Sequence, residues 1–206
     1  MENSMKKGQL RLLAIKLSSL NIKTHQSAFT LIELLITLAM VFILSGMALP
    51  SFKEVLDNSK LSVQVDGLVK TLKVARTTAI SENRKVTICP TDETQICLSE
   101  WTNGYMSFID ENGDRKLNNE EKILTYFKNQ NEKLTLSWKA FGFRKSLQWL
   151  ETGITNHQNG SFQFCYNNDA SKSRALIITK AGRIRYSKDI DGDNIHENSR
   201  GKPLVC

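Results

Sequence analysis

A run of cations late in the sequence is the segment best suited to binding an anionic polymer. Between Ala170 and Lys188 there are basic residues and no acidic ones: Lys172, Arg174, Lys180, Arg183, Arg185 and Lys188. The segment reads as a strand over 175–179, a turn over 180–182 and a second strand from Arg183 to Tyr186, and Gly182 suits the positive φ of a tight hairpin. Because strand side chains alternate, Arg183 and Arg185 are expected on one face, about 6.5 to 7 Å apart, which suits successive phosphates of a nucleic-acid strand.

The residues alone leave a second interpretation of this hairpin open. Arginines on an edge strand also keep that edge from pairing with other chains, in which case the charged face is only solvated. A contact with phosphates would read no base sequence and would weaken steeply with salt. The hairpin is therefore a candidate for sequence-independent DNA binding, with a structural role as the alternative.

Two acidic turns offer oxygen ligands, and both are interpreted as solvated turns. Residues 110–114, with Glu121, approach the spacing of a calcium loop, but Arg115 stands where that loop needs glycine. Residues 189–193 lack a terminal glutamate at the expected distance. The histidines have no nucleophile signature beside them. We therefore predict no enzyme activity, no metal site and no cofactor.

Four cysteines, an even number, follow the apolar N-terminal region, and their spacing has no CxxC pair of the zinc type. They are Cys89, Cys97, Cys165 and Cys206. Two disulfides in an oxidising compartment are the natural interpretation. Of the three possible pairings we favour Cys89 with Cys97, which closes a local loop, and Cys165 with Cys206, which ties the last residue to a central strand.

The elements that would position these residues are a long helix and an antiparallel sheet domain. From 50 to 80, apolar residues recur at helical spacing and form one stripe: Leu61, Val65, Leu68, Leu72, Ala75 and Ala79. This amphipathic helix is expected to pack on the sheets, with Pro50 marking a kink or a break. Residues 81–206 form the β-rich head, with strands expected over 85–89, 105–109, 123–127, 134–138, 162–166, 175–179 and 183–187.

Residues 29–49 have the length and composition of a membrane span. They are mostly apolar and carry a single charge, on Glu33, and about 21 helical residues cross a hydrocarbon layer of roughly 30 Å. Residues 1–28 carry a net charge of +4, which predicts a leader on the cytoplasmic side and the rest of the chain outside. A charged group inside the span requires a partner or a function, unless Glu33 lies near the interface.

The segment Ser27-Ala28-Phe29-Thr30-Leu31-Ile32-Glu33-Leu34 resembles the cleavage and methylation motif of type IV pilins and type II secretion pseudopilins. The resemblance implies that prepilin peptidase cuts between Ala28 and Phe29 and methylates Phe29. It also implies that Glu33 pairs with the N-terminal amine of a neighbouring pilin in the filament. Ala28 departs from the glycine usual before the cut, and the leader is longer than most. The implied location is the inner membrane, with the head in the periplasm and later on the pilus.

The head, with Cys165, Cys206 and the run Gly182-Arg183-Ile184-Arg185, resembles the FimT branch of the GspH/FimT family. The resemblance implies an α+β fold, with a long N-terminal helix followed by a two-sheet β-sandwich, and DNA capture in natural transformation. It assigns DNA contact to Arg183 and Arg185; charge alone adds Lys172, Arg174, Lys180 and Lys188 as supporting cations. The competing hypothesis is a structural pseudopilin of a secretion or pilus-initiation complex without DNA binding. Of the formal net charge of +7, residues 1–28 carry +4 and residues 170–188 carry +6, so the remainder is at −3.

Overall fold

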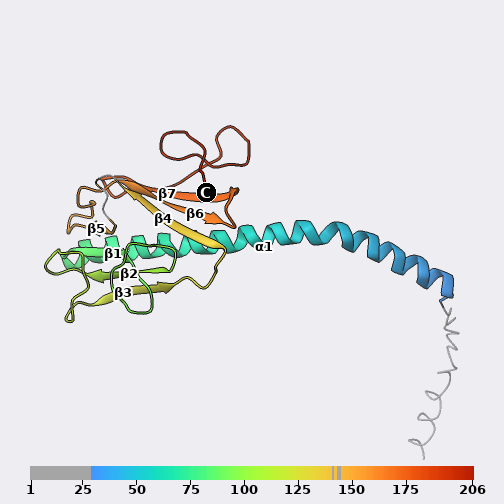
Figure 1. Ribbon diagram of the computed structural model, residues 1–206, viewed down its shortest axis with the longest axis horizontal. Coiled ribbons are helices and arrows are strands. Elements are labelled where there is room, and N and C mark those ends of the chain that lie inside the picture. Colours follow the sequence, from blue (N-terminus) through green and yellow to red (C-terminus); the bar gives the residue numbers. More distant parts are fainter. Residues whose placement is uncertain (1–28, 141, 143–144) are drawn as a thin grey trace, which may run out of the picture. The chain divides into compact units, whose positions relative to one another are not determined.

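The computed structural model describes residues 29–140, 142 and 145–206, so the predicted leader and Ala28 lie outside the described residues. The described chain divides into two compact units, with the boundary between residues 47 and 48. Within the described residues, one helix is followed by two sheets (Figure 1). The elements are α1 (Leu31–Glu82), β1 (Val86–Pro90), β2 (Gly104–Ile109), β3 (Ile123–Lys128), β4 (Leu134–Ala140), β5 (Leu147–Trp149), β6 (Gly160–Tyr166), β7 (Asp169–Ile178) and β8 (Ile184–Tyr186).

Helix α1 begins at a threonine cap, because the Glu33 amide donates to Thr30 Oγ1 at 3.3 Å. Its apolar side chains from Leu31 to Leu44 are exposed. Position 50 is helical, so the break that Pro50 allows is not observed. Among the described residues we find no helix both long and apolar enough to cross a membrane, and the span over 29–49 stays a prediction.

Each sheet has four strands, and all strand pairs are antiparallel. The first sheet has the order β3-β2-β1-β5 and the second the order β4-β6-β7-β8. The two-sheet, α+β fold expected from the sequence is confirmed. Strand β5 was not expected: it has only three residues, all buried, and so shows no alternation. Strand β7 begins at Asp169, earlier than expected, and β8 ends at Tyr186, leaving Arg183 and Ser187 outside it.

One hydrophobic core joins the C-terminal part of α1 to the inner faces of both sheets. All six residues of the predicted helical stripe are buried in it, from Leu61 to Ala79. Every second residue of the second sheet faces this core, for example Phe162 and Phe164 on β6 and Leu176 and Ile178 on β7. The residues between them therefore lie on the outer face of the second sheet, away from α1.

The two disulfides join Cys89 to Cys97 and Cys165 to Cys206, which are the pairs favoured from the sequence. The first closes the loop after β1. The second ties the last residue of the chain to β6. It therefore holds the C-terminal segment against the second sheet, where it forms part of the candidate site.

Candidate nucleic-acid interface

The turn between β7 and β8 is fixed by hydrogen bonds and by the lack of a side chain at Gly182. The Gly182 amide donates to the Thr179 carbonyl at 2.9 Å, and the Arg183 amide donates to Thr179 Oγ1 at 3.1 Å. Gly182 is buried, its φ is +80°, and a Cβ built there would lie 2.4 Å from the Gly153 carbonyl oxygen. Gly182 therefore shapes the hairpin. It is buried and has no side chain, so it cannot contact a ligand itself.

Arg76 of α1 donates hydrogen bonds that hold the same turn against the helix. Its Nε donates to the Gly153 carbonyl at 2.8 Å, and its Nη2 donates to the Ala181 carbonyl at 3.3 Å. The guanidinium also lies over the Trp149 ring, 5.7 Å from the ring centroid. This arginine is therefore used in holding the turn to the helix.

The register of β8 decides which of its side chains face outward. Ile178 pairs with Ile184, and Ile177 pairs with Arg185. Ile184 packs against the core, and the Tyr186 hydroxyl donates to Asp66 Oδ1 of α1 at 3.2 Å. Because Arg185 lies between these two inward side chains, it projects from the outer face of the second sheet.

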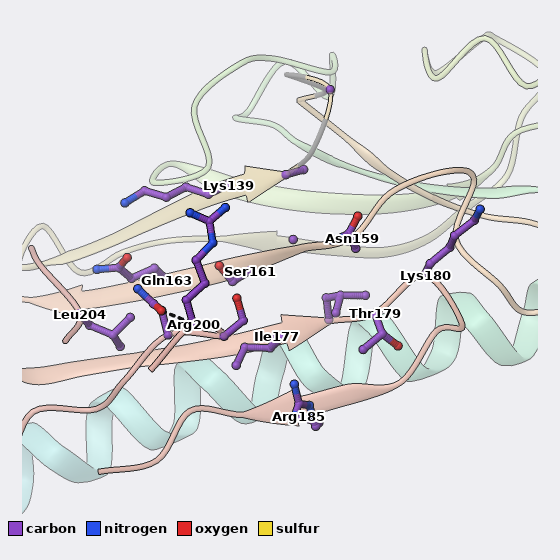
Figure 2. A pocket seen from close by; sticks show the side chains of 16 residues that line it. Lys139, Asn159, Ser161, Gln163, Ile177, Thr179, Lys180, Arg185, Arg200 and Leu204 are labelled. Carbon is purple, nitrogen blue, oxygen red and sulfur yellow. Dashed lines mark hydrogen bonds between the residues drawn. The ribbon is translucent and has the colours of Figure 1, made fainter. Parts of the chain in front are cut away.

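A cleft of about 950 Å³ lies on that outer face (Figure 2). Its floor comes from β6 and β7, through residues such as Ser161, Gln163 and Ile177. Four cations line it, each from a different part of the chain: Lys139 of β4, Lys180 of the turn, Arg185 of β8 and Arg200 of the C-terminal segment. Among the described residues that line this cleft there is no carboxylate, and no ion pair of the described chain involves these four cations.

The wall that carries Arg200 is the tail, which we define as residues 198–206. Besides the disulfide to Cys165, the tail is held by Gln163 Nε2, which donates to the Val205 carbonyl at 2.7 Å, and by burial of Leu204. A turn within the tail is closed by Asn198, whose Oδ1 accepts from the Arg200 amide at 2.8 Å. Arg200 therefore stands on an anchored segment.

The cations expected from the sequence are not all brought together. Lys180 and Arg185 line the cleft, whereas Arg183 and Lys188 are exposed outside it. Lys172 pairs with Asp57 of α1 at 3.4 Å. Arg174 donates to the Ser173 carbonyl at 2.7 Å, and its burial lowers the pKa of its guanidinium. Lys172 and Arg174 thus share the inward side of β7 with Leu176 and Ile178.

Two cleft cations, Lys139 and Arg200, were missed from the sequence. Alternation along β4 contains a signal for Lys139, because Leu134, Leu136 and Trp138 turn toward the core and leave Lys139 outward. The signal for Arg200 is weaker. It is the nearby terminal cysteine, whose bond to β6 brings the tail onto this face.

The carboxylates of Asp110 and Glu121 in the first acidic turn accept hydrogen bonds from other groups of the protein. Asp110 is buried, and its Oδ2 accepts from Thr87 Oγ1 and Gln148 Nε2, each at 2.6 Å. Glu121 accepts from the Glu111 amide at 2.9 Å through Oε1 and from the Asn118 amide at 3.0 Å through Oε2. These groups hold the turn that follows β2.

Comparisons with known proteins place these features in context. The profile of the family described as type II transport protein GspH matches residues 64–182, and that of the prokaryotic N-terminal methylation motif matches residues 23–49. The search of curated proteins found no match.

Two solved structures are similar to this chain. The type IV minor pilin FimU of Pseudomonas aeruginosa is 21% identical, with a TM-score of 0.50 over 72% of this chain and 96% of that chain. The minor pseudopilin EpsH from the type 2 secretion system of Vibrio cholerae is 10% identical, with a TM-score of 0.46 over 61% of this chain and 94% of that chain. At 21% identity, the likeness to FimU concerns the fold alone.

Proposed function

Because the chain belongs to the GspH family and is a minor type IV pilin or pseudopilin, we propose that its outer cleft binds the phosphate backbone of DNA during natural transformation. The observation that carries the proposal is the convergence of four cations from four segments on one cleft with no acidic residue among its described lining. A chain that is at −3 outside residues 1–28 and 170–188 has no general attraction for DNA. Binding would therefore be local to this face.

The cleft suits a backbone and not a base sequence. Arg185 and Arg200 offer planar forks of donors that match phosphate oxygens, and Lys139 and Lys180 add point charges. No partner within the described chain competes for these groups through an ion pair. The exposed Arg183 beside the cleft would extend the contact along the strand.

The proposal predicts how steeply the affinity for DNA falls as the salt concentration rises. Each phosphate neutralised on B-DNA contributes about −0.9 to the slope of log K against log salt. Four contacts give a slope of roughly −3.6, and thus a loss of affinity of roughly 150-fold between 50 and 200 mM salt. One such cleft would bind weakly, and several copies on a filament would raise the overall affinity.

The test is fluorescence anisotropy with a labelled duplex and residues 48–206, the unit that contains the whole core. The variant Lys180→Ala with Arg185→Ala should lower affinity and reduce the salt slope by about 2. The control, Lys116→Ala with Lys122→Ala, removes the same charge from two exposed positions near β3 and should leave the slope unchanged. Equal slopes for both double variants would reject the cleft and favour a structural minor pseudopilin.

Assembly follows from the family, and its details are proposals. The methylation motif indicates a membrane-anchored subunit that is processed by prepilin peptidase and assembles with other pilins. We place the cut between Ala28 and Phe29, followed by methylation of Phe29. The apolar residues from Leu31 to Leu44 are exposed and need lipid or neighbouring helices around them. In that setting Glu33 would pair with the terminal amine of a neighbouring subunit.

A further inference from the structure

The loop after β8 gathers four carboxylates. Asp189, Asp191, Asp193 and Glu197 each offer an oxygen, and these oxygens all lie within 4.8 Å of one another. Within the described part of the chain, this is the one such group of possible metal ligands. The sequence suggested a solvated loop lacking a terminal glutamate, but the fold brings Glu197 back to the three aspartates.

Glu197 is the feature that a solvated loop does not explain. Only 5% of the surface of Glu197 is exposed. Oε2 accepts from the Ile190 amide at 2.8 Å, whereas Oε1 is buried and accepts no hydrogen bond within the described chain. A buried carboxylate oxygen without a donor is costly, and three further carboxylates close by add like-charge repulsion. No ion pair of the described residues involves any of the four.

A cation held by these oxygens would remove both costs. Calcium binds six to eight oxygens at 2.3–2.6 Å, so two oxygens on opposite sides of the ion lie about 4.6–5.2 Å apart. The 4.8 Å limit on the oxygen separations fits that span. Magnesium, at 2.0–2.1 Å, requires a smaller octahedron and usually keeps several waters. The all-oxygen donor set also disfavours zinc and copper, which take nitrogen or sulfur ligands.

The loop already has the curvature that such a site requires. The Gly192 amide donates to Asp189 Oδ1 at 2.7 Å, and the Ile195 amide donates to Asp193 Oδ1 at 2.7 Å. These bonds orient the aspartates and leave oxygen lone pairs free to coordinate, because a carboxylate has about four acceptor sites.

We propose that Asp189, Asp191, Asp193 and Glu197 bind one calcium ion, which fixes the loop to the tail. Glu197 forms backbone bridges with Lys188 on one side and with Pro203 of the tail on the other. An ion bound to Glu197 therefore secures the segment that carries Arg200. The proposal rests on the carboxylates alone and holds whether or not the cleft binds DNA.

The test is titration calorimetry of the full chain in mild detergent, stripped with a chelator, with calcium chloride and magnesium chloride as separate titrants. We expect one calcium per chain and at least tenfold weaker magnesium binding. Glu197→Gln should weaken calcium binding at least tenfold, and so should Asp193→Asn, whose exposed side chain carries no core contact. Asp114→Asn, in the other acidic turn, is the matched control and should bind as the native chain does.

Two results would overturn the proposal. One is the absence of a calcium heat from native protein at millimolar calcium. The other is equal calcium binding by Asp193→Asn and Asp114→Asn, which would place the ion elsewhere. Circular dichroism of each variant shows whether it has folded. If Glu197→Gln fails to fold, Asp193→Asn still tests the proposal.

Discussion

Replacing Gly182 by alanine tests whether the hairpin is positioned by close packing. The added Cβ would lie 2.4 Å from the Gly153 carbonyl oxygen, 2.8 Å from Trp149 Cζ3 and 3.0 Å from Arg76 Cζ. Two of these neighbours are poorly able to move, because one is backbone and the other is a fully buried ring. The residue also has φ +80°, a conformation that disfavours any side chain.

The expected loss has two parts. Placing alanine in the left-handed region costs about 1–2 kcal/mol. Overpacking against fixed neighbours adds about 1–3 kcal/mol. Gly182→Ala should therefore lower the free energy of unfolding by about 2–5 kcal/mol.

Gly201→Ala is the matched control, since Gly201 has φ +71° and nothing within 4 Å of its built Cβ. It should lose only the conformational part, about 1–2 kcal/mol. Both substitutions reduce the entropy of the unfolded chain by the same amount, so the difference between them isolates the packing. Urea denaturation of residues 48–206 measures both. Equal losses for the two variants would refute the claim that contact with Gly153 and Trp149 sets the hairpin.

Two further predictions concern α1. Burial alone would raise the pKa of Asp57, but hydrogen bonds from Tyr166 and Lys172, with the charges of Lys172 and Lys60, lower it below its ordinary 3.8. The ionised Asp57 therefore stabilises the fold at pH values above 3.8, its pKa in the unfolded chain. This stabilisation is lost as the pH falls through the lower pKa of Asp57 in the folded protein. In melting curves below pH 5, Asp57→Asn should show a shallower loss of stability than native protein, and parallel curves would contradict this. The second prediction is that Glu33→Ala lowers the incorporation of the protein into filaments to background, as measured by immunoblot of purified filaments. The control, Glu54→Ala, changes an exposed residue of the same helix and should be incorporated normally. Equal incorporation of the two variants would exclude a role of Glu33 in assembly.

The elements that the sequence predicted best are those with a clear period. The stripe from Leu61 to Ala79 follows one helical face, and all of its residues are buried. Strand β5 gave no such signal, because Gln148 is as buried as its two neighbours. Its polarity is used inside the protein, where Gln148 Nε2 donates to Asp110 Oδ2 and Thr87 Oγ1. A buried polar network of this kind is set by tertiary contacts that no local pattern contains.

The site was predicted only in part because it is assembled across the fold. The register of β8 placed Arg185 outward as alternation requires, but Lys139 joins it only because β4 and β8 lie in the same sheet. Arg200 and Glu197 are placed by the return of the chain after β8, through bridges and the disulfide to β6. These long-range connections determine which charges meet.

The charge run over 170–188 shows why the density of charge in a sequence does not define a binding surface. Side chains on β7 alternate between two faces, and Leu176 and Ile178 identify the inward one. Lys172 and Arg174 lie on the same inward face, where Lys172 forms an ion pair with Asp57 and Arg174 donates to backbone carbonyls. A charge-only contact with DNA needs cations that are accessible and free of internal partners, since each internal ion pair must be broken before a phosphate can replace it. The four cations of the cleft meet that condition, although only two of them belong to the run.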